Sequence, residues 1–314
     1  MTDSPIDFST GAPVSGSLDV RWIHGAPKRA PNADPPIQVH AYDDHTYVLR
    51  QSKATSFEAP FMYLFFGNDR ALLLDTGATK DAGAFPLRDT VDTIVRDWIA
   101  KHPRDSYPLV VAHTHGHGDH VAGDAQFADR PDTTVVPADV VSATRFFGFS
   151  SWPTETVTVD LGGRVLEVTG IPGHDDRSIA VYDPWTGFLV TGDSVYPGRL
   201  YVRDMPAFVD SLGRLVAFTE SHPVTHVMGC HVEMSRRRRR DYHTGCKYQP
   251  HEADLPMTVA QLVAARDAAV ASAGRPGIHV FDDFIIFNGM ERRQAPAYIG
   301  YWLWSRLRNR VTRV

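Results

Sequence analysis

Short apolar runs separated by turn residues dominate the first quarter of the chain and predict β-strands. We place these strands at residues 37–41, 46–51, 61–66 and 71–75. Gly67-Asn68-Asp69, between the last two runs, is typical of a hairpin turn. The pattern then changes to helical spacing over residues 90–99, where one face collects the apolar side chains Val91, Ile94, Val95, Trp98 and Ile99.

Beyond residue 100, segments with the pattern of strands alternate with segments with the spacing of helices. Strands are predicted at 109–111, 133–136, 155–160, 164–169, 178–182, 187–191, 224–228 and 278–287. Helices are predicted at 121–127, 138–147, 205–219, 255–273 and 297–310. Each half of the chain therefore runs strands, helix, strand, helix, which indicates two similar halves with a sheet in each. No internal sequence repeat accompanies this order.

Composition places the chain among ordinary globular proteins, with 43% hydrophobic and 22% charged residues in 314. The net charge of −5 argues against a nucleic-acid footprint over the whole surface. Only Cys230 and Cys246 could form a disulfide, so no disulfide framework holds the fold. The acidic N-terminus is not a secretory signal, and no apolar run reaches the roughly 20 residues that span a bilayer. We therefore expect a cytoplasmic location.

Residues 1–36 are rich in Pro, Gly, Ser and Asp and predict an irregular N-terminal arm. The exception is the segment 20–24, around Trp22, which could anchor the arm to the body or to a second subunit.

The residues that carry chemistry begin where the strand at 109–111 ends. His115, His117, Asp119 and His120 are four potential metal ligands within six positions. Gly116 and Gly118 lack a Cβ, which lets the backbone turn tightly enough for neighbouring side chains to converge. Imidazole nitrogens with a carboxylate suit zinc, iron or manganese. This stretch predicts a metal site.

The pattern His-x-His-x-Asp-His in these four residues resembles the signature of the metallo-β-lactamase superfamily. The resemblance implies an α/β fold of a particular kind, the four-layer αββα sandwich, over residues 37–290 as one catalytic domain. Residues 291–314 would then form a C-terminal helical extension.

The resemblance also implies ligands further along the chain. His174 matches the family's third histidine, Asp193 the carboxylate that bridges two metals, and His231 the final histidine. One site would take His115, His117 and His174, and the other Asp119, His120 and His231, with Asp193 and a hydroxide joining them. Asp75, at the end of a strand, is a candidate to orient a ligand histidine. The other ten histidines keep a structural interpretation, although His113 could support the site, and Cys230 is interpreted as a packed thiol.

From this ligand set we expect a metal-dependent hydrolase with two Zn²⁺ per chain, Fe or Mn being alternatives. A metal-bound hydroxide would attack a carbonyl-type bond (ester, thioester, lactone or lactam) of a small molecule. Asp119 would bind its metal and orient the nucleophile, and Tyr196 could donate a hydrogen bond to the developing oxyanion.

Three alternatives stay open at this point. A mononuclear iron dioxygenase of the persulfide dioxygenase type shares the fold, and so do phosphodiesterases and nucleases. The 38 positions between Asp193 and His231 leave no room for the extra domain that such nucleases often carry. The third alternative is a purely structural metal site, which usually favours cysteine ligands.

Two further features bear on partners. The run Arg236–Arg240 reads as an exposed loop that could attract an anionic substrate at the rim of the pocket. The C-terminal helix is aromatic and then basic, typical of packing on the body or in a dimer, with a membrane-surface helix as the alternative. We expect a small-molecule substrate and neither nucleic acid nor membrane as partner, and we leave a homodimer open.

Overall fold

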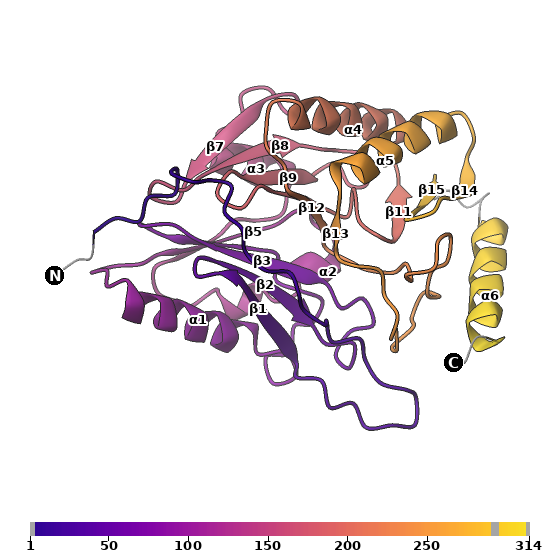
Figure 1. Ribbon diagram of the computed structural model, residues 1–314, viewed down its shortest axis with the longest axis horizontal. Helices are drawn as coiled ribbons and strands as arrows, with labels where there is room; N and C mark the ends of the chain where they lie inside the picture. The colour runs from indigo at the N-terminus through magenta and orange to yellow at the C-terminus, as the bar shows by residue number, and fades with distance from the viewer. Residues whose placement is uncertain (1–3, 290–294, 312–314) are drawn as a thin grey trace.

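The computed structural model describes residues 4–289 and 295–311. Two six-stranded sheets pack face to face, and helices cover their outer surfaces (Figure 1). This is the four-layer αββα sandwich expected from the sequence, so the predicted fold class is confirmed.

The first sheet has the order β1-β2-β3-β4-β5-β6. Its strands are β1 (Ile37–Asp43), β2 (Thr46–Gln51), β3 (Phe61–Phe66), β4 (Ala71–Leu74), β5 (Leu109–Ala112) and β6 (Thr133–Val135). The helix α1 (Leu87–Lys101) packs on the outer face through a buried stripe that includes Trp98. Since β3 and β4 are covered on both faces, every one of their residues is buried and apolar.

The second sheet has the order β13-β12-β10-β9-β8-β7. Its strands are β7 (Thr156–Asp160), β8 (Val165–Gly170), β9 (Ile179–Asp183), β10 (Phe188–Gly192), β12 (His226–Gly229) and β13 (Pro256–Met257). The helices α4 (Met205–Thr219) and α5 (Val259–Ser272) cover its outer face (Figure 1). Apolar residues from both sheets form the central core, and α3 (Val140–Phe147) closes one side of it.

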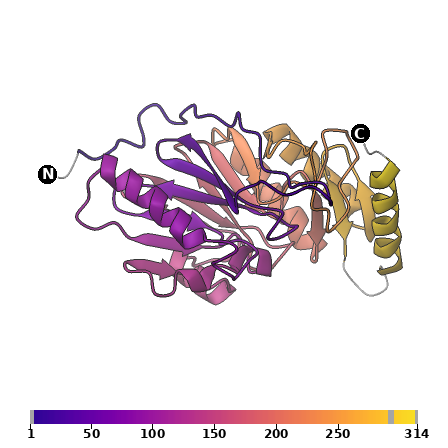
Figure 2. The same ribbon diagram turned by 90° about the horizontal axis from the view of Figure 1, so that it is seen from below.

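A third, small sheet extends the second half, with the order β11-β15-β14. It consists of β11 (Arg199–Val202), β15 (Ile285–Asn288) and β14 (Gly277–Val280). The last helix, α6 (Ala295–Val311), lies beyond this sheet at the edge of the molecule (Figures 1 and 2).

Four local predictions differ from the structure. The single strand predicted at 278–287 is wrong, because the chain turns at Phe281–Phe284 and pairs β14 with β15 as a hairpin. The predicted helix at 121–127 is instead the short α2 (Gly118–Val121) followed by a 3₁₀ turn at Asp124–Gln126. β11 was not predicted, because it has no distinct apolar alternation. The helix predicted at 255–273 is wrong at its start, because Pro256–Met257 form β13 and α5 begins at Val259 after the capping residue Thr258.

The N-terminal segment 4–36 forms no helix or strand and lies on the body. The Phe8 ring meets that of Trp185 edge-on at 5.2 Å, and the Trp22 ring meets that of Phe61 at 5.0 Å. The first strand begins at Ile37, while the division into arm, catalytic domain and extension stays a prediction. Within the described residues, no helix is both long and apolar enough to cross a membrane.

A buried arginine joins the two sheets. Arg164, at the start of β8, forms two contacts with Asp183 of β9, Nη2–Oδ2 at 2.5 Å and Nε–Oδ1 at 3.1 Å. Its guanidinium also donates to Thr46 Oγ1 and to the carbonyls of His45 and Phe66 in the first sheet. All its donors are therefore used across the sandwich, which satisfies a charge that is 1% exposed.

A second buried cluster fixes the long segment 230–255 to the first sheet. Arg50 of β2 donates to both carboxylate oxygens of Glu252, at 2.5 and 2.7 Å. Lys53 is 2% exposed, and its Nζ lies 3.7 Å from Glu252 Oε1. Burial lowers the pKa of Lys53 from its usual 10.5 to about 8, against the attraction of Glu252.

We expect Arg164→Met to lower the free energy of unfolding by about 3–5 kcal/mol, because Asp183 would stay buried without its cation. Urea denaturation followed by circular dichroism measures this. Arg96→Met, at an exposed position of α1, is the matched control and should change the free energy by less than about 0.5 kcal/mol. Equal losses in the two variants would contradict the role of Arg164.

We expect Lys53→Met to remove a pH dependence of stability. The folded-state pKa of Lys53, about 8, lies below the unfolded value of 10.5, so between these pH values the unfolded chain binds more protons. The contribution of Lys53 to the free energy of unfolding therefore rises with pH across this window. The difference between wild type and Lys53→Met, measured by urea denaturation at pH 7 and pH 10, should show that rise. Lys101→Met, at an exposed position of α1, serves as control, and a pH-independent difference for Lys53→Met would refute the prediction.

Candidate metal centre

Two pairs of parallel strands bring the candidate ligands to one edge of the sandwich. In the first sheet β4 pairs parallel with β5, so the turns after both strands leave at the same end. In the second sheet β10 pairs parallel with β12, and their ends carry Asp193 and His231. Because the carboxyl ends of parallel strands meet at one edge, the two sheets present their polar turns to each other.

The first group of ligand atoms comes from His115, His117 and His174. His117 Nδ1 lies 3.0 Å from His115 Nε2 and 3.0 Å from His174 Nε2, and the two Nε2 atoms are 3.3 Å apart. His174 owes its place to Gly173, whose φ of +139° is rarely open to other residues. A Cβ at Gly173 would also lie 2.5 Å from Phe208 Cα in α4.

The second group comes from Asp119, His120, Asp193 and His231. His231 Nε2 lies 3.2 Å from Asp119 Oδ2, 3.4 Å from Asp193 Oδ1 and 3.4 Å from His120 Nε2. His120 Nε2 lies 3.6 Å from Asp119 Oδ2 and 3.5 Å from Asp193 Oδ1. Four donor atoms from three separate segments therefore surround one point.

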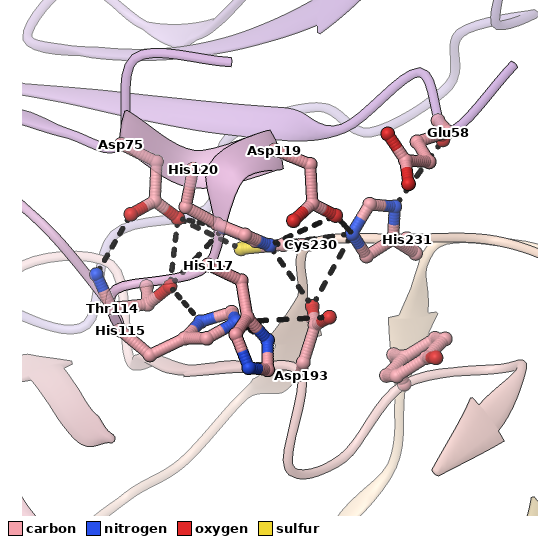
Figure 3. A network of polar contacts seen from close by, with 12 residues as sticks. Glu58, Asp75, Thr114, His115, His117, Asp119, His120, Asp193, Cys230 and His231 are labelled. Carbon is pink, nitrogen blue, oxygen red and sulfur yellow. Dashed lines mark hydrogen bonds and ion pairs between the residues drawn. The ribbon is translucent and has the colours of Figure 1, made fainter. Parts of the chain in front are cut away.

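Asp193 lies between the two groups (Figure 3). Its Oδ1 belongs to the second group, while its Oδ2 faces the first, 3.8 Å from His174 Nε2 and 4.0 Å from His115 Nε2. A carboxylate placed this way can offer one oxygen to each of two neighbouring sites.

The outward ring nitrogens of three histidines have acceptors that fix the rings. His120 Nδ1 lies 2.9 Å from Asp75 Oδ2, His174 Nδ1 2.7 Å from the Tyr201 carbonyl, and His231 Nδ1 3.2 Å from the Glu58 carbonyl. A ring that donates from Nδ1 presents the lone pair of Nε2 to the centre. This is the arrangement in which protein histidines hold metals.

Asp75 lies next to the ligand groups and joins the neighbouring turns by hydrogen bonds (Figure 3). Its Oδ1 accepts from the Thr114 backbone N–H at 2.7 Å, and its Oδ2 from the Thr114 hydroxyl at 2.8 Å as well as from His120. The Cys230 thiol donates to the same Oδ2 at 3.3 Å. Asp75 has a φ of +71°, a strained conformation that aspartate tolerates better than most residues.

Charge is divided unequally between the two groups. Burial lowers the pKa of His115, His117 and His174, so these rings are neutral and keep their lone pairs. Burial also acts on His231, but Asp193 and Asp119 outweigh it and raise the pKa of His231 to about 9. In turn His231 and His120 hold the pKa of Asp193 well below the carboxyl range despite burial.

Several contributors carry no sequence signal of their own. His117 Nε2 lies 3.3 Å from Asp175 Oδ2, and Arg177 fixes that carboxylate through two contacts of 2.6 Å. In the sequence, the one feature that points to a role for Asp175 is its position directly after His174. Thr114 lies between two histidines and gives no signal in the sequence, because threonine is not a usual metal ligand.

Two other residues have plain structural partners. His113 lies 2.8 Å from Asp124 Oδ1 and 3.1 Å from the Val136 carbonyl, outside both ligand groups. Tyr196 is buried with its ring near that of His231, and its hydroxyl donates to the Arg199 carbonyl. With its one proton engaged there, this arrangement gives Tyr196 no free donor for an oxyanion.

The residues present fit metal ions. Ligands held about 2.0–2.1 Å from one tetrahedral zinc ion lie about 3.3 Å from each other, close to the spacings in both groups. The imidazole nitrogens of the first group lie 3.0–3.3 Å apart, and neutral rings whose lone pairs face one another do not stabilise each other. A cation at each point would turn these contacts into coordination.

Comparison with known proteins supports the fold and the family. A sequence model described as the metallo-β-lactamase superfamily matches residues 56–209. The hydroxyacylglutathione hydrolase of Erythrobacter litoralis is 27% identical over 191 residues, 60% of this chain and 72% of the relative. That of Nostoc punctiforme is 30% identical over 115 residues, 34% of this chain and 45% of the relative. The chain spans about half the length of most curated relatives that it matches.

Solved structures agree on the architecture. The metallo-β-lactamase DIM-1, in a crystal exposed to ceftazidime, superposes with a TM-score of 0.50 at 14% identity, covering 76% of this chain and 98% of that one. TMB-1 superposes with the same score at 15% identity, covering 76% and 100%. The αββα sandwich, the His-x-His-x-Asp-His turn and the matched sequence model agree, so this chain is similar to the metallo-β-lactamase superfamily over residues 56–209 and has its fold.

Proposed function

We propose that this protein is a hydrolase with two zinc ions that cleaves a carbonyl-type bond of a small molecule, a thioester first among the candidates. The observation that carries the proposal is the position of Asp193 between two complete ligand groups. A mononuclear iron dioxygenase would use only one group. The second group, with four ligand atoms within 4.8 Å of one another, would then have no purpose.

Zinc ions in these groups would supply a water that ionises near neutral pH and a Lewis acid for the carbonyl oxygen. The chain's own residues position the reactants. Asp119 offers Oδ2 to the second group, which leaves Oδ1 to accept a hydrogen from the attacking water and to orient it. Asp75 and the Glu58 carbonyl fix the rings of His120 and His231, so that the ligand lone pairs do not turn away.

The thioester preference comes from the relatives. Several are named hydroxyacylglutathione hydrolase, and an acyl group carried on the sulfur of glutathione is a thioester. The segment between Asp193 and His231 is filled by β11 and α4, which favours a small-molecule substrate over the nuclease alternative. A cytoplasmic location is part of the same proposal.

A substrate panel with parallel metal analysis tests this function. We expect zinc-loaded protein to hold two zinc ions per chain and to hydrolyse a hydroxyacyl thioester of glutathione faster than a chromogenic lactam, a lactone or a phosphodiester. A content of one iron ion per chain together with oxygen consumption would contradict the hydrolase and support the dioxygenase alternative. Phosphodiester cleavage as the fastest reaction would favour the nuclease alternative instead.

Removing one ligand from either group should abolish efficient turnover. We expect His174→Ala and His231→Ala each to lower the zinc content from two ions towards one and to reduce kcat/KM by more than about 100-fold. Elemental analysis and steady-state kinetics measure both effects. His226→Ala, in the strand before His231, is the matched control and should keep two zinc ions. Full metal content in the ligand variants would overturn the assignment.

Asp75→Asn should weaken zinc binding without unfolding the chain. Asparagine tolerates the φ of +71°, but its amide cannot accept from His120, Thr114 and Cys230 as the carboxylate does. We expect zinc affinity of the second group to fall about 10–100-fold, measured by competition with a chelator. Asp132→Asn, an exposed position with a φ of +49°, is the control and should bind zinc normally. Equal affinity in both variants would show that Asp75 does not support the centre.

A further inference from the structure

The last helix leaves a strip of apolar side chains uncovered. Its members are Ile299 (59% exposed), Trp302 (36%), Leu303 (48%) and Leu307 (59%), which we call the α6 face. Their spacing of three, four and eight residues puts them on one side of the helix. The opposite side packs on the small sheet, where the rings of Tyr298 and Tyr301 lie 5.3 and 5.6 Å from that of Phe287.

A group of arginines lies beside the end of this helix. We call residues 236–240, five consecutive arginines, the arginine segment. Arg236 to Arg239 are exposed, and Arg240 Nη2 lies 3.5 Å from the Arg308 carbonyl of α6. Partial burial and then the charges of Arg308 and Arg237 lower the pKa of Arg240, as expected where cations crowd together.

The positive charge of this region is only partly balanced. Arg236 pairs with Asp254 at 3.6 Å and Arg238 with Asp282 at 3.2 Å, all four at the surface. In the described part of the chain, the side chains of Arg237 and Arg239 have no acidic partner. The sequence of α6 adds three arginines, of which Arg308 pairs with Asp241, and no acidic residue, in a protein whose net charge is −5.

Side-chain contacts of Asp241 attach the helix to the body. Asp241 follows directly after the arginine segment. Its Oδ1 accepts a hydrogen bond from Arg308 Nη2 of α6 at 2.6 Å. Its Oδ2 receives Arg199 Nη1 of β11 at 3.1 Å. Asp241 thereby links α6 to the small sheet directly after the arginine segment, and α6 lies at the edge of the molecule (Figure 2).

We propose that the α6 face and the arginine segment together bind the surface of a bilayer that contains anionic lipid. An exposed strip of Ile, Leu and Trp next to clustered arginines is the composition with which helices lie in a membrane interface. The arginines would meet lipid phosphates, and the apolar strip would enter the acyl boundary. From the sequence we expected no membrane partner. We depart from that expectation because the structure leaves this strip uncovered on a helix whose last turns contact the arginine segment.

Two other occupants fit less well. Pairing of α6 with α6 of a second copy would bring arginines together without an acidic residue in either helix to oppose them. A nucleic acid would use the arginines, but Ile299, Leu303 and Leu307 have no counterpart on a phosphate backbone.

Co-sedimentation of the full chain with vesicles tests the proposal and needs no turnover. We expect binding to vesicles of phosphatidylglycerol mixed with phosphatidylcholine, weak binding to phosphatidylcholine alone, and loss of binding as salt is raised. Leu303→Glu, and separately Arg237→Glu with Arg239→Glu, should each reduce the bound fraction at least tenfold. Brominated lipids should quench tryptophan fluorescence, and Trp302→Phe should reduce that quenching.

The matched controls carry the same chemical changes elsewhere. Val270→Glu places a carboxylate at a 54% exposed apolar position of α5, and Arg96→Glu reverses an exposed charge on α1. Both should bind vesicles like wild type. The absence of binding to anionic vesicles would overturn the proposal, as would equal loss in the controls. A dimer that Leu303→Glu dissociates, without vesicle binding, would assign the face to a second copy. Binding to an RNA oligonucleotide but not to vesicles would assign it to nucleic acid.

Discussion

Five imidazoles and two carboxylates converge at one edge of the sandwich, and such a set cannot be buried without compensating charge or protons. The three rings of the first group are neutral and turn their lone pairs towards one another. In the second group, His120 and His231 hold the pKa of Asp119 and of Asp193 well below the carboxyl range despite burial. A pair of cations would compensate the charge of both groups, and this is the physical reason for the metal centre proposed above.

The surrounding fold is organised to keep this set in place. Parallel strand pairs in each sheet direct the ligand-bearing turns to the same edge, and Arg164 joins the sheets by donating to both. Asp75, directly after β4, has a strained backbone conformation. Its carboxylate accepts hydrogen bonds from two turns and from the Cys230 thiol. Strain of this kind persists where neighbouring contacts over-determine it, and here those contacts are the supports of the centre.

The second half of the chain carries structure beyond the matched residues 56–209. His231 lies in it, and so do the arginine segment, the small sheet and α6. Asp241 connects the last helix to β11, and Tyr201 of β11 in turn fixes the ring of His174. The segment after residue 209 is thus connected to the candidate centre through β11.

The sequence by itself determined most helices and strands, their order in two similar halves, and the cluster from His115 to His120, because these depend on local periodicity and on neighbours in the chain. The αββα fold class came from the resemblance to a known family. Resemblance to the family then pointed to His174, Asp193 and His231. Only the tertiary structure decided which ring nitrogen faces the centre, the part played by Asp175 and Thr114, and the engagement of the Tyr196 hydroxyl. The tertiary structure also showed that residues 278–287 form a hairpin of two strands. The sequence pattern could not show this, because one long strand and two short ones have the same alternation of side chains. Such features rest on contacts between residues far apart in the chain, and strand register and sheet packing set those contacts, not the type of any single residue.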